Sequence, residues 1–136
     1  MSPAKKWHQL RESRIASLLN RLMPQGEVVA QPPLRTREGT KVADVSWFSE
    51  QRLVEVGVSD DEAEFLIAAD IMIEVLSYSN SDKEMAFKRT LYFELGAVEC
   101  WLCDLEGQMT FWDVNGPIGQ SKLCPEFPKV VRRRGA

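Results

Sequence analysis

The sequence predicts an α/β (α+β) fold, in which a mixed sheet is flanked by helices. The main observation is the order of the periodic segments: an amphipathic helix, several strand-like runs, a second helix and further strand-like runs. The second observation is the chain's size and composition. Its 136 residues, with 44% hydrophobic and 27% charged content, suit a folded chain with one core. We therefore expect a single domain over residues 1–136.

The first expected element is an amphipathic helix over residues 4–23. Its apolar residues recur at helical spacing and share one side. They are Trp7, Leu10, Ile15, Leu18, Leu19 and Leu22. Pro24 ends the helix. Glu12 lies at the margin of the apolar side, and His8 lies within it.

Short strands are expected after this helix. Residues 27–31 are strand-like and are broken by Pro32 and Pro33, and residues 34–37 continue as an edge strand. Glu38 and Gly39 make a turn, and residues 42–48 form a further strand that contains Asp44. The first half of the chain therefore predicts a helix followed by part of a sheet.

The most apolar strand is expected over residues 69–76, which places it at the centre of the sheet. A helix follows over residues 81–96. Ser81 and Glu84 have the spacing of a capping box, and Gly96 supplies the left-handed residue that ends the helix.

The remaining segments are less regular. Residues 98–103 and 108–114 predict two strands of a hairpin, and residues 115–136 are expected to be an irregular tail. Residues 49–68 have no clear periodicity, and Ser59–Glu62 fits either the cap of a short helix or a loop.

Lys88 is the most informative residue, because it lies in the middle of an apolar arc of the second helix. The arc consists of Met85, Phe87, Leu91, Tyr92 and Leu95. A lysine on a buried face costs several kcal/mol unless another group compensates its charge. Asp44 and Glu74 could do so, since each lies in an otherwise apolar strand. A structural ion pair between Lys88 and Glu74 is the simpler interpretation.

The same residues could form a hydrolytic site. Two carboxylates on neighbouring strands can hold a divalent ion such as Mg²⁺, which polarises a phosphoryl oxygen and helps to generate hydroxide. The ammonium of Lys88 could then orient the attacking water or stabilise developing charge. Glu12 could add a third carboxylate, although a solvated glutamate on the flank of the helix fits its position equally well.

The formal net charge of −3 disfavours a protein whose main role is to bind nucleic acid, because non-specific DNA binding requires a basic face. Two local basic clusters remain. Arg35 and Arg37 precede the strand of Asp44, and Lys129, Arg132, Arg133 and Arg134 lie near the end of the chain. A solvated terminus is the simpler interpretation of the second cluster.

Composition also addresses compartment and cysteine chemistry. No apolar run reaches the roughly 18 residues that span a membrane. The first residues lack the apolar core of a signal peptide, so we expect a cytoplasmic protein with no membrane partner. Cys100 and Cys103 have C-x-x-C spacing without a second ligand pair, so we expect these residues and Cys124 to be buried thiols, neither zinc ligands nor a redox motif.

Three segments carry a resemblance to a known family: Val42–Trp47, Ala69–Ser77, and the stretch from Lys88 and Tyr92 to Asp104. In this order they resemble the Uma family of predicted restriction endonucleases, which belongs to the PD-(D/E)xK nuclease superfamily. The resemblance covers about residues 8–114. It implies a restriction-endonuclease-like core and Mg²⁺- or Mn²⁺-dependent endonucleolytic hydrolysis of DNA.

The resemblance also implies roles for individual residues. Asp44 corresponds to the aspartate of the PD element and Glu74 to the second metal carboxylate, with the backbone carbonyl of Val75 as a further ligand. Lys88 is similar in position to the family's lysine, which has moved from the strand to the following helix. Glu12 resembles the acidic residue that the superfamily often places on its first helix.

Two positions depart from the superfamily pattern. Ala43 stands where proline is usual, which changes the stiffness of the backbone. Leu76 occupies the usual lysine position, so catalysis would depend on Lys88. A homodimer would be natural, because cutting two strands uses two sites. The alternatives are a catalytically silent nuclease fold that serves as a binding or assembly module, and a hydrolase of another phosphate-containing substrate.

Overall fold

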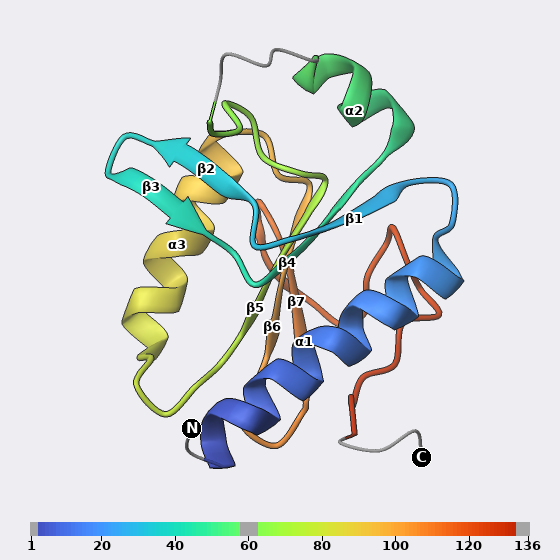
Figure 1. Cartoon of the computed structure of the whole chain (residues 1–136), viewed down its shortest axis with the longest axis vertical. Coiled ribbons are helices and arrows are strands. Elements are labelled where there is room, and N and C mark those ends of the chain that lie inside the picture. Colours follow the sequence, from blue (N-terminus) through green and yellow to red (C-terminus); the bar gives the residue numbers. More distant parts are fainter. Residues whose placement is uncertain (1–2, 58–62, 133–136) are drawn as a thin grey trace.

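Residues 3–57 and 63–132 are described by a computed structural model, in which a mixed six-stranded sheet lies between two helical layers (Figure 1). The helices are α1 (Pro3–Leu22), α2 (Glu50–Val56) and α3 (Asp82–Glu94). The strands are β1 (Glu27–Ala30), β2 (Pro33–Thr36), β3 (Gly39–Val42), β4 (Val45–Phe48), β5 (Ile71–Val75), β6 (Glu99–Cys103), β7 (Met109–Asp113) and β8 (Gly116–Ile118). The predicted α+β class and mixed sheet are confirmed.

The sheet has the order β1-β4-β5-β6-β7-β8, and β2 pairs with β3 in a separate hairpin. Only β5 and β6 are parallel, joined through α3, while the other neighbours are antiparallel. β5 is buried along its whole length, as expected for the most apolar strand. Its carboxyl end therefore lies at the middle of one edge of the sheet.

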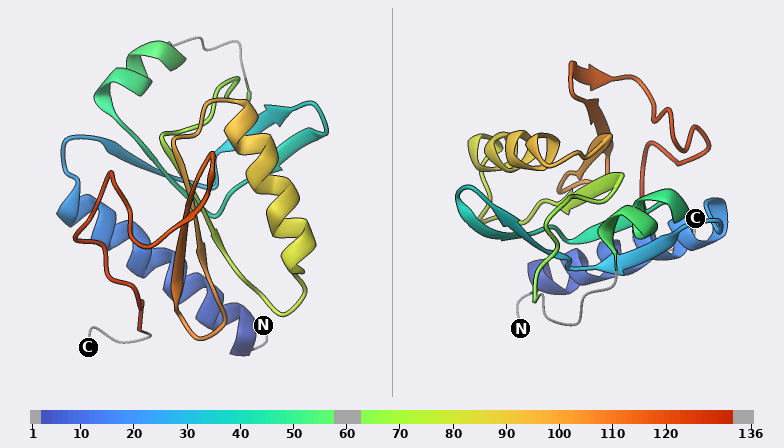
Figure 2. Two further views of the ribbon diagram at one scale, coloured as in Figure 1. Left: turned by 180° about the vertical axis from the view of Figure 1, so that it is seen from behind. Right: turned by 90° about the horizontal axis from the view of Figure 1, so that it is seen from above.

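The two faces of the sheet have different helical partners, since α1 and α3 lie on opposite sides (Figure 2). Ile71 and Ile73 of β5 pack in one core with Ile15 of α1. Met72, on the opposite face of the same strand, packs in a second core with Tyr92 of α3. This period-two alternation sends Glu74 toward α3.

Helix α1 confirms the prediction for residues 4–23 and corrects one end of its apolar side. Ile15 and Leu19 are fully buried. Trp7 and Leu10 are 37% and 48% exposed, so the beginning of the helix contributes little to the core. No described helix is both long and apolar enough to cross a bilayer.

The strand predicted over residues 42–48 is interrupted in the structure. Val42 ends β3, which belongs to the small hairpin, and Val45 begins β4 of the main sheet. Ala43 and Asp44 connect the two, because the chain changes sheets at this point. Asp44 nevertheless keeps a backbone contact with the main sheet, since its N–H donates to the Ile73 carbonyl at 3.0 Å.

Helix α3 begins at the predicted cap, where the Ser81 hydroxyl accepts a hydrogen bond from the Glu84 N–H at 3.1 Å. It ends before Gly96, whose φ of 100° is the left-handed conformation that favours glycine. The predicted apolar arc is wrong at Phe87, which is 42% exposed. The buried residues of α3 are Met85, Leu91 and Tyr92.

Helix α2 lies in the region where the sequence shows no periodicity. Its N-cap is Ser49, whose hydroxyl accepts from the Arg52 N–H and also contacts the Asp70 carboxylate at 3.0 Å. The prediction for Ser59–Glu62 lies outside the described residues, as do Arg133 and Arg134 of the basic end.

The prediction of an irregular tail is wrong at β8, which pairs with β7. Residues 119–132 follow without further strands and pack through Phe127 and Val131 into the core that contains α1. The three cysteines are buried and form no disulfide among the described residues, as expected.

A buried carboxylate holds this last segment. Glu99 is 1% exposed and accepts hydrogen bonds from Trp101 Nε1 at 2.8 Å and Ser121 Oγ at 2.6 Å. The N–H groups of Lys122 and Leu123 donate to its other oxygen at 2.8 and 3.1 Å. Because a buried carboxylate requires such partners, Glu99 fixes the path of residues 121–123.

Candidate active site at the carboxyl end of β5

Asp44 is fixed at the junction of β4 and β5. Val45 pairs with Ile73 in the antiparallel register, so Asp44 lies opposite Glu74. The N–H of Val75 donates to Asp44 Oδ2 at 2.6 Å, which orients the carboxylate across the end of β5. The structure thus places Asp44 and Glu74 at neighbouring positions of adjacent chain segments.

Glu74 is held from the α3 side. Its side chain is 8% exposed, and its Oε2 accepts from Lys88 Nζ at 2.8 Å and from the Tyr92 hydroxyl at 2.6 Å. Burial raises the pKa of Glu74 to about 7, the Lys88 ammonium opposes this shift, and the charge of Asp44 adds to it. The buried carboxylate therefore depends on Lys88 to remain ionised near neutral pH.

The side chain of Lys88 points toward Glu74, as its place on the inner side of α3 predicts. Its side chain is 17% exposed, and besides Glu74 its ammonium donates to the Val42 carbonyl at 3.2 Å. An ammonium has three N–H donors, so one remains after these two contacts. That donor is suited to a third oxygen, such as one from water or phosphate.

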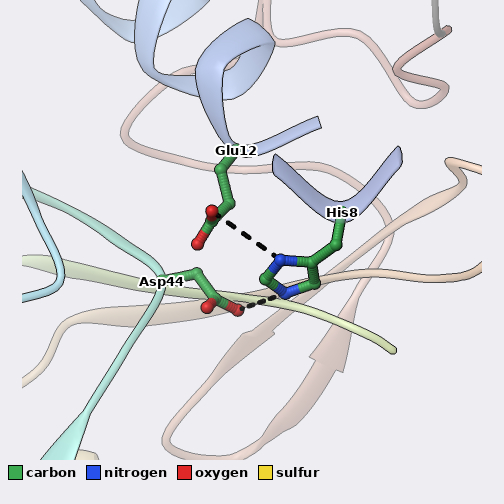
Figure 3. Close-up of side chains that lie close together, drawn as sticks. All are labelled: His8, Glu12 and Asp44. Carbon is green, nitrogen blue, oxygen red and sulfur yellow. Dashed lines mark ion pairs between the residues drawn. The ribbon is translucent and has the colours of Figure 1, made fainter. Parts of the chain in front are cut away.

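His8 and Glu12 approach Asp44 from α1, and Figure 3 shows the imidazole beside the two carboxylates, with an ion-pair line to each. His8 Nε2 lies 3.5 Å from Asp44 Oδ2, and His8 Nδ1 lies 3.7 Å from Glu12 Oε2. One ligand atom from each of the three residues falls within 4.8 Å of the others. The site is therefore built from both faces of the sheet, with Asp44 between them.

Glu12 is in an environment that disfavours its charge. Its Oε1 atom is buried and has no hydrogen-bond partner among residues 3–57 and 63–132. Burial, together with the neighbouring carboxylates of Asp44 and Glu74, raises the pKa of Glu12 to about 8. A cation at this position would relieve the repulsion and satisfy the buried oxygen.

These donors fit a hard divalent ion. Carboxylate and carbonyl oxygens are the ligands that Mg²⁺ prefers, and an imidazole nitrogen is also acceptable to Mn²⁺. The unpartnered Glu12 Oε1 and the raised pKa of Glu12 and Glu74 both indicate negative charge that the described side chains do not fully compensate.

The structure brings Asp44 to the Val75 N–H and Lys88 to Glu74, whereas the compact group of possible metal ligands among the described residues is His8, Glu12 and Asp44, without Glu74. His8 and Tyr92 also contact these residues, although sequence reasoning gave neither a role in the site. A signal existed for both. His8 precedes Glu12 by one helical turn, and Tyr92 follows Lys88 at the same spacing, so each pair shares a helix face.

The carboxyl group of Glu12 should make the metal-free protein less stable as the pH rises. Its pKa of about 8 lies above the ordinary value of 4.5, so the folded state holds a proton that the unfolded chain loses. Between these two values stability should fall with pH, by at most about 1.4 kcal/mol per pH unit for one proton. Glu74 acts in the same direction up to about pH 7.

Melting temperatures in EDTA from pH 5.5 to 8 would measure this effect. The Glu12→Gln variant should show a shallower decline, and added Mn²⁺ should restore stability of the unmodified protein most strongly at the upper end. Equal slopes for the two proteins would contradict the assignment. Unchanged Mn²⁺ affinity of Glu12→Gln would remove Glu12 from the ligand set.

Comparison with known proteins gives a family and a fold. The model of the Uma2 family, described as "Putative restriction endonuclease", matches residues 1–124. A crystal structure described as a "putative nuclease belonging to DUF820" from Anabaena variabilis superposes with a TM-score of 0.67 at 19% identity. The alignment covers 90% of this chain and 64% of that one, so this chain spans about two thirds of that protein's length. No curated protein matches the sequence significantly.

Proposed function

The chain belongs to the Uma2 family, and from this membership and the geometry of the site we propose that it is a divalent-metal-dependent endonuclease that hydrolyses DNA phosphodiester bonds. The observation that carries the proposal is the arrangement at the end of β5. By the register of β4 against β5, Asp44 lies opposite Glu74 on the adjacent segment, and Lys88 Nζ lies 2.8 Å from Glu74 Oε2. Two carboxylates and a cation within one small region suit phosphoryl chemistry.

Asp44, Glu74 and the Val75 carbonyl would hold a Mg²⁺ or Mn²⁺ ion, with Glu12 and His8 on the α1 side of it. Such an ion polarises a phosphoryl oxygen and helps to generate hydroxide. Its ligands are prepositioned by the protein, since the Val75 N–H orients Asp44 and the Tyr92 hydroxyl orients Glu74. These two hydrogen bonds reduce the reorganisation that binding requires.

Lys88 supplies a fixed positive charge. Its contacts with Glu74 and the Val42 carbonyl hold the ammonium at the end of β5, with one donor left. In this position the ammonium can orient the attacking water or donate to a phosphate oxygen as negative charge develops. It also favours the ionised form of Glu74.

Cleavage of supercoiled plasmid DNA tests the proposal. We expect nicked and linear products in Mg²⁺ or Mn²⁺ and none in EDTA, with activity restored by adding the metal in excess. The Asp44→Asn protein, purified in parallel, controls for contaminating nucleases. Metal-independent cleavage, or equal cleavage by the Asp44→Asn protein, would contradict the proposal. DNA binding without cleavage in either metal would support the silent-module alternative.

We propose two further properties. The protein would act in the cytoplasm, a reducing compartment that suits three unbonded buried cysteines. It would act as a homodimer, because a double-strand cut requires two such sites. Sedimentation at increasing protein concentration, with and without DNA, checks the second property.

A further inference from the structure

Two cavities adjoin each other along α1. The first, of about 570 Å³, lies between the second half of α1 and residues 128–132, and the second, of about 490 Å³, extends from there to His8. Both are lined by Val130, Val131 and Arg132, so they adjoin the same segment and are here called the groove. Because His8 contacts Asp44, the groove ends at the candidate active site.

The groove is basic although the whole chain is acidic. Arg14, Arg21 and Arg132 line the first cavity together with apolar and hydroxyl-bearing residues and no carboxylate. Arg11 lines the second, where Glu106 is the one acidic lining residue. Positive charge is therefore concentrated in the groove, although the formal net charge of the chain is −3.

These four arginines differ from Arg35 and Arg37, which form the basic cluster before the strand of Asp44. Arg35 pairs with Glu64 at 3.1 Å, and Arg37 pairs with Glu94 at 2.8 Å. The cluster that the sequence suggests as a basic surface is thus neutralised. In contrast, the groove arginines form no ion pair within residues 3–57 and 63–132.

Arg11 provides a second indication of a ligand. Its Nε atom is buried and has no hydrogen-bond partner among the described residues. A buried guanidinium N–H without an acceptor is costly, and an incoming phosphate oxygen would satisfy it.

The spacing of the arginines suits a linear polyanion. Arg14 and Arg21 are seven residues apart on α1, which is roughly 10.5 Å at about 1.5 Å per residue. This distance corresponds to about three nucleotides at roughly 3.4 Å of rise per residue of one strand. Arg11 continues the same line toward His8, since it lies three residues before Arg14.

We propose that the groove between α1 and residues 128–132 binds the phosphodiester backbone of one DNA strand and leads it to the carboxylates at the end of β5. This proposal rests on the proposed function for the identity of the polymer. Arg14, Arg21 and Arg132 contact phosphates spaced along the strand, and Arg11 contacts a phosphate nearer the site. These contacts position the strand without reading its sequence.

The test compares two double variants with the same change in charge. Arg14→Gln/Arg21→Gln removes two groove charges, and Arg35→Gln/Arg37→Gln removes two paired surface charges. Affinity for a labelled DNA duplex is measured in Ca²⁺, a hard cation that takes oxygen ligands, over a series of salt concentrations. Plasmid cleavage in Mg²⁺ is measured in parallel.

The groove variant should bind about tenfold more weakly, and its slope of log affinity against log salt should fall by about 2 relative to the unmodified protein. The Arg35→Gln/Arg37→Gln control should keep the affinity and salt slope of the unmodified protein. If the groove variant keeps the affinity and salt slope of the unmodified protein, or if both variants lose affinity equally, the groove does not bind the DNA strand. Such a result would leave the proposed cleavage activity untouched. Binding that depends on Arg14 and Arg21 without cleavage in any metal would support the groove and refute the nuclease. A chain that binds no DNA overturns both.

Discussion

Replacing Lys88 by methionine should lower metal-dependent cleavage at least about 100-fold while the protein remains folded. Such a loss equals about 2.7 kcal/mol of transition-state stabilisation, as expected for a preorganised charge beside the reacting phosphate. Methionine keeps most of the aliphatic volume of lysine. The fold should survive because loss of the ammonium raises the pKa of Glu74 further, so that this buried carboxyl becomes neutral and no unpaired charge remains.

Two roles of Lys88 can be separated by the pH dependence of the variant. If Lys88 only keeps Glu74 ionised, Lys88→Met should recover activity at alkaline pH, where Glu74 loses its proton without help. If the ammonium acts on the attacking water or the phosphate, the loss should persist at every pH. Lys83→Met, an exposed change on the same helix, is the matched control. A lowered melting temperature with undiminished Mg²⁺-dependent activity would leave Lys88 as a structural residue.

Replacing Glu99 by alanine should have the largest effect on stability. The change removes the acceptor of four hydrogen bonds, from Trp101, Ser121, Lys122 and Leu123. Each buried donor left unpaired costs about 1–3 kcal/mol, so the free energy of unfolding should fall by about 4 kcal/mol or more. A loss of this size is a large fraction of the stability of a typical domain.

Urea unfolding of three variants would measure the effect. Glu99→Gln should fall between the unmodified protein and Glu99→Ala, because the amide keeps one acceptor oxygen and presents N–H groups to the remaining donors. Glu126→Ala, an exposed change in the same segment, should lie within about 0.5 kcal/mol of the unmodified protein. A Glu99→Ala protein as stable as the control would mean that water replaces the carboxylate.

The sequence predicts the fold well where one periodic pattern determines an element. Helix α1, helix α3 and strand β5 follow directly from hydrophobic spacing and from caps such as Ser81. The interruption after Val42 could not be predicted, because both flanking segments are strand-like and only tertiary pairing shows that they belong to different sheets. Helix α2 is too short to display a periodicity.

Some residues of the candidate site could also be predicted from the sequence, and others could not. Lys88 is conspicuous in the sequence because a charge among apolar helix positions violates the local pattern. His8 is not conspicuous, since an imidazole on a helix side is compatible with many environments and its contact with Asp44 joins distant segments. Tyr92 resembles a core aromatic in the sequence, and only its hydroxyl contact with Glu74 distinguishes it.

The site joins residues that are far apart in the sequence. They are His8 on α1, Asp44 before β4, Glu74 on β5, and Lys88 and Tyr92 on α3. The contact of Asp44 with the Val75 N–H depends on the register of β4 against β5, and the contacts of Glu74 with Lys88 and Tyr92 depend on the packing of α3 against β5. Nascent or partly unfolded chains should therefore be unable to cut DNA. If the proposed activity is correct, this activity would arise only once the chain has folded.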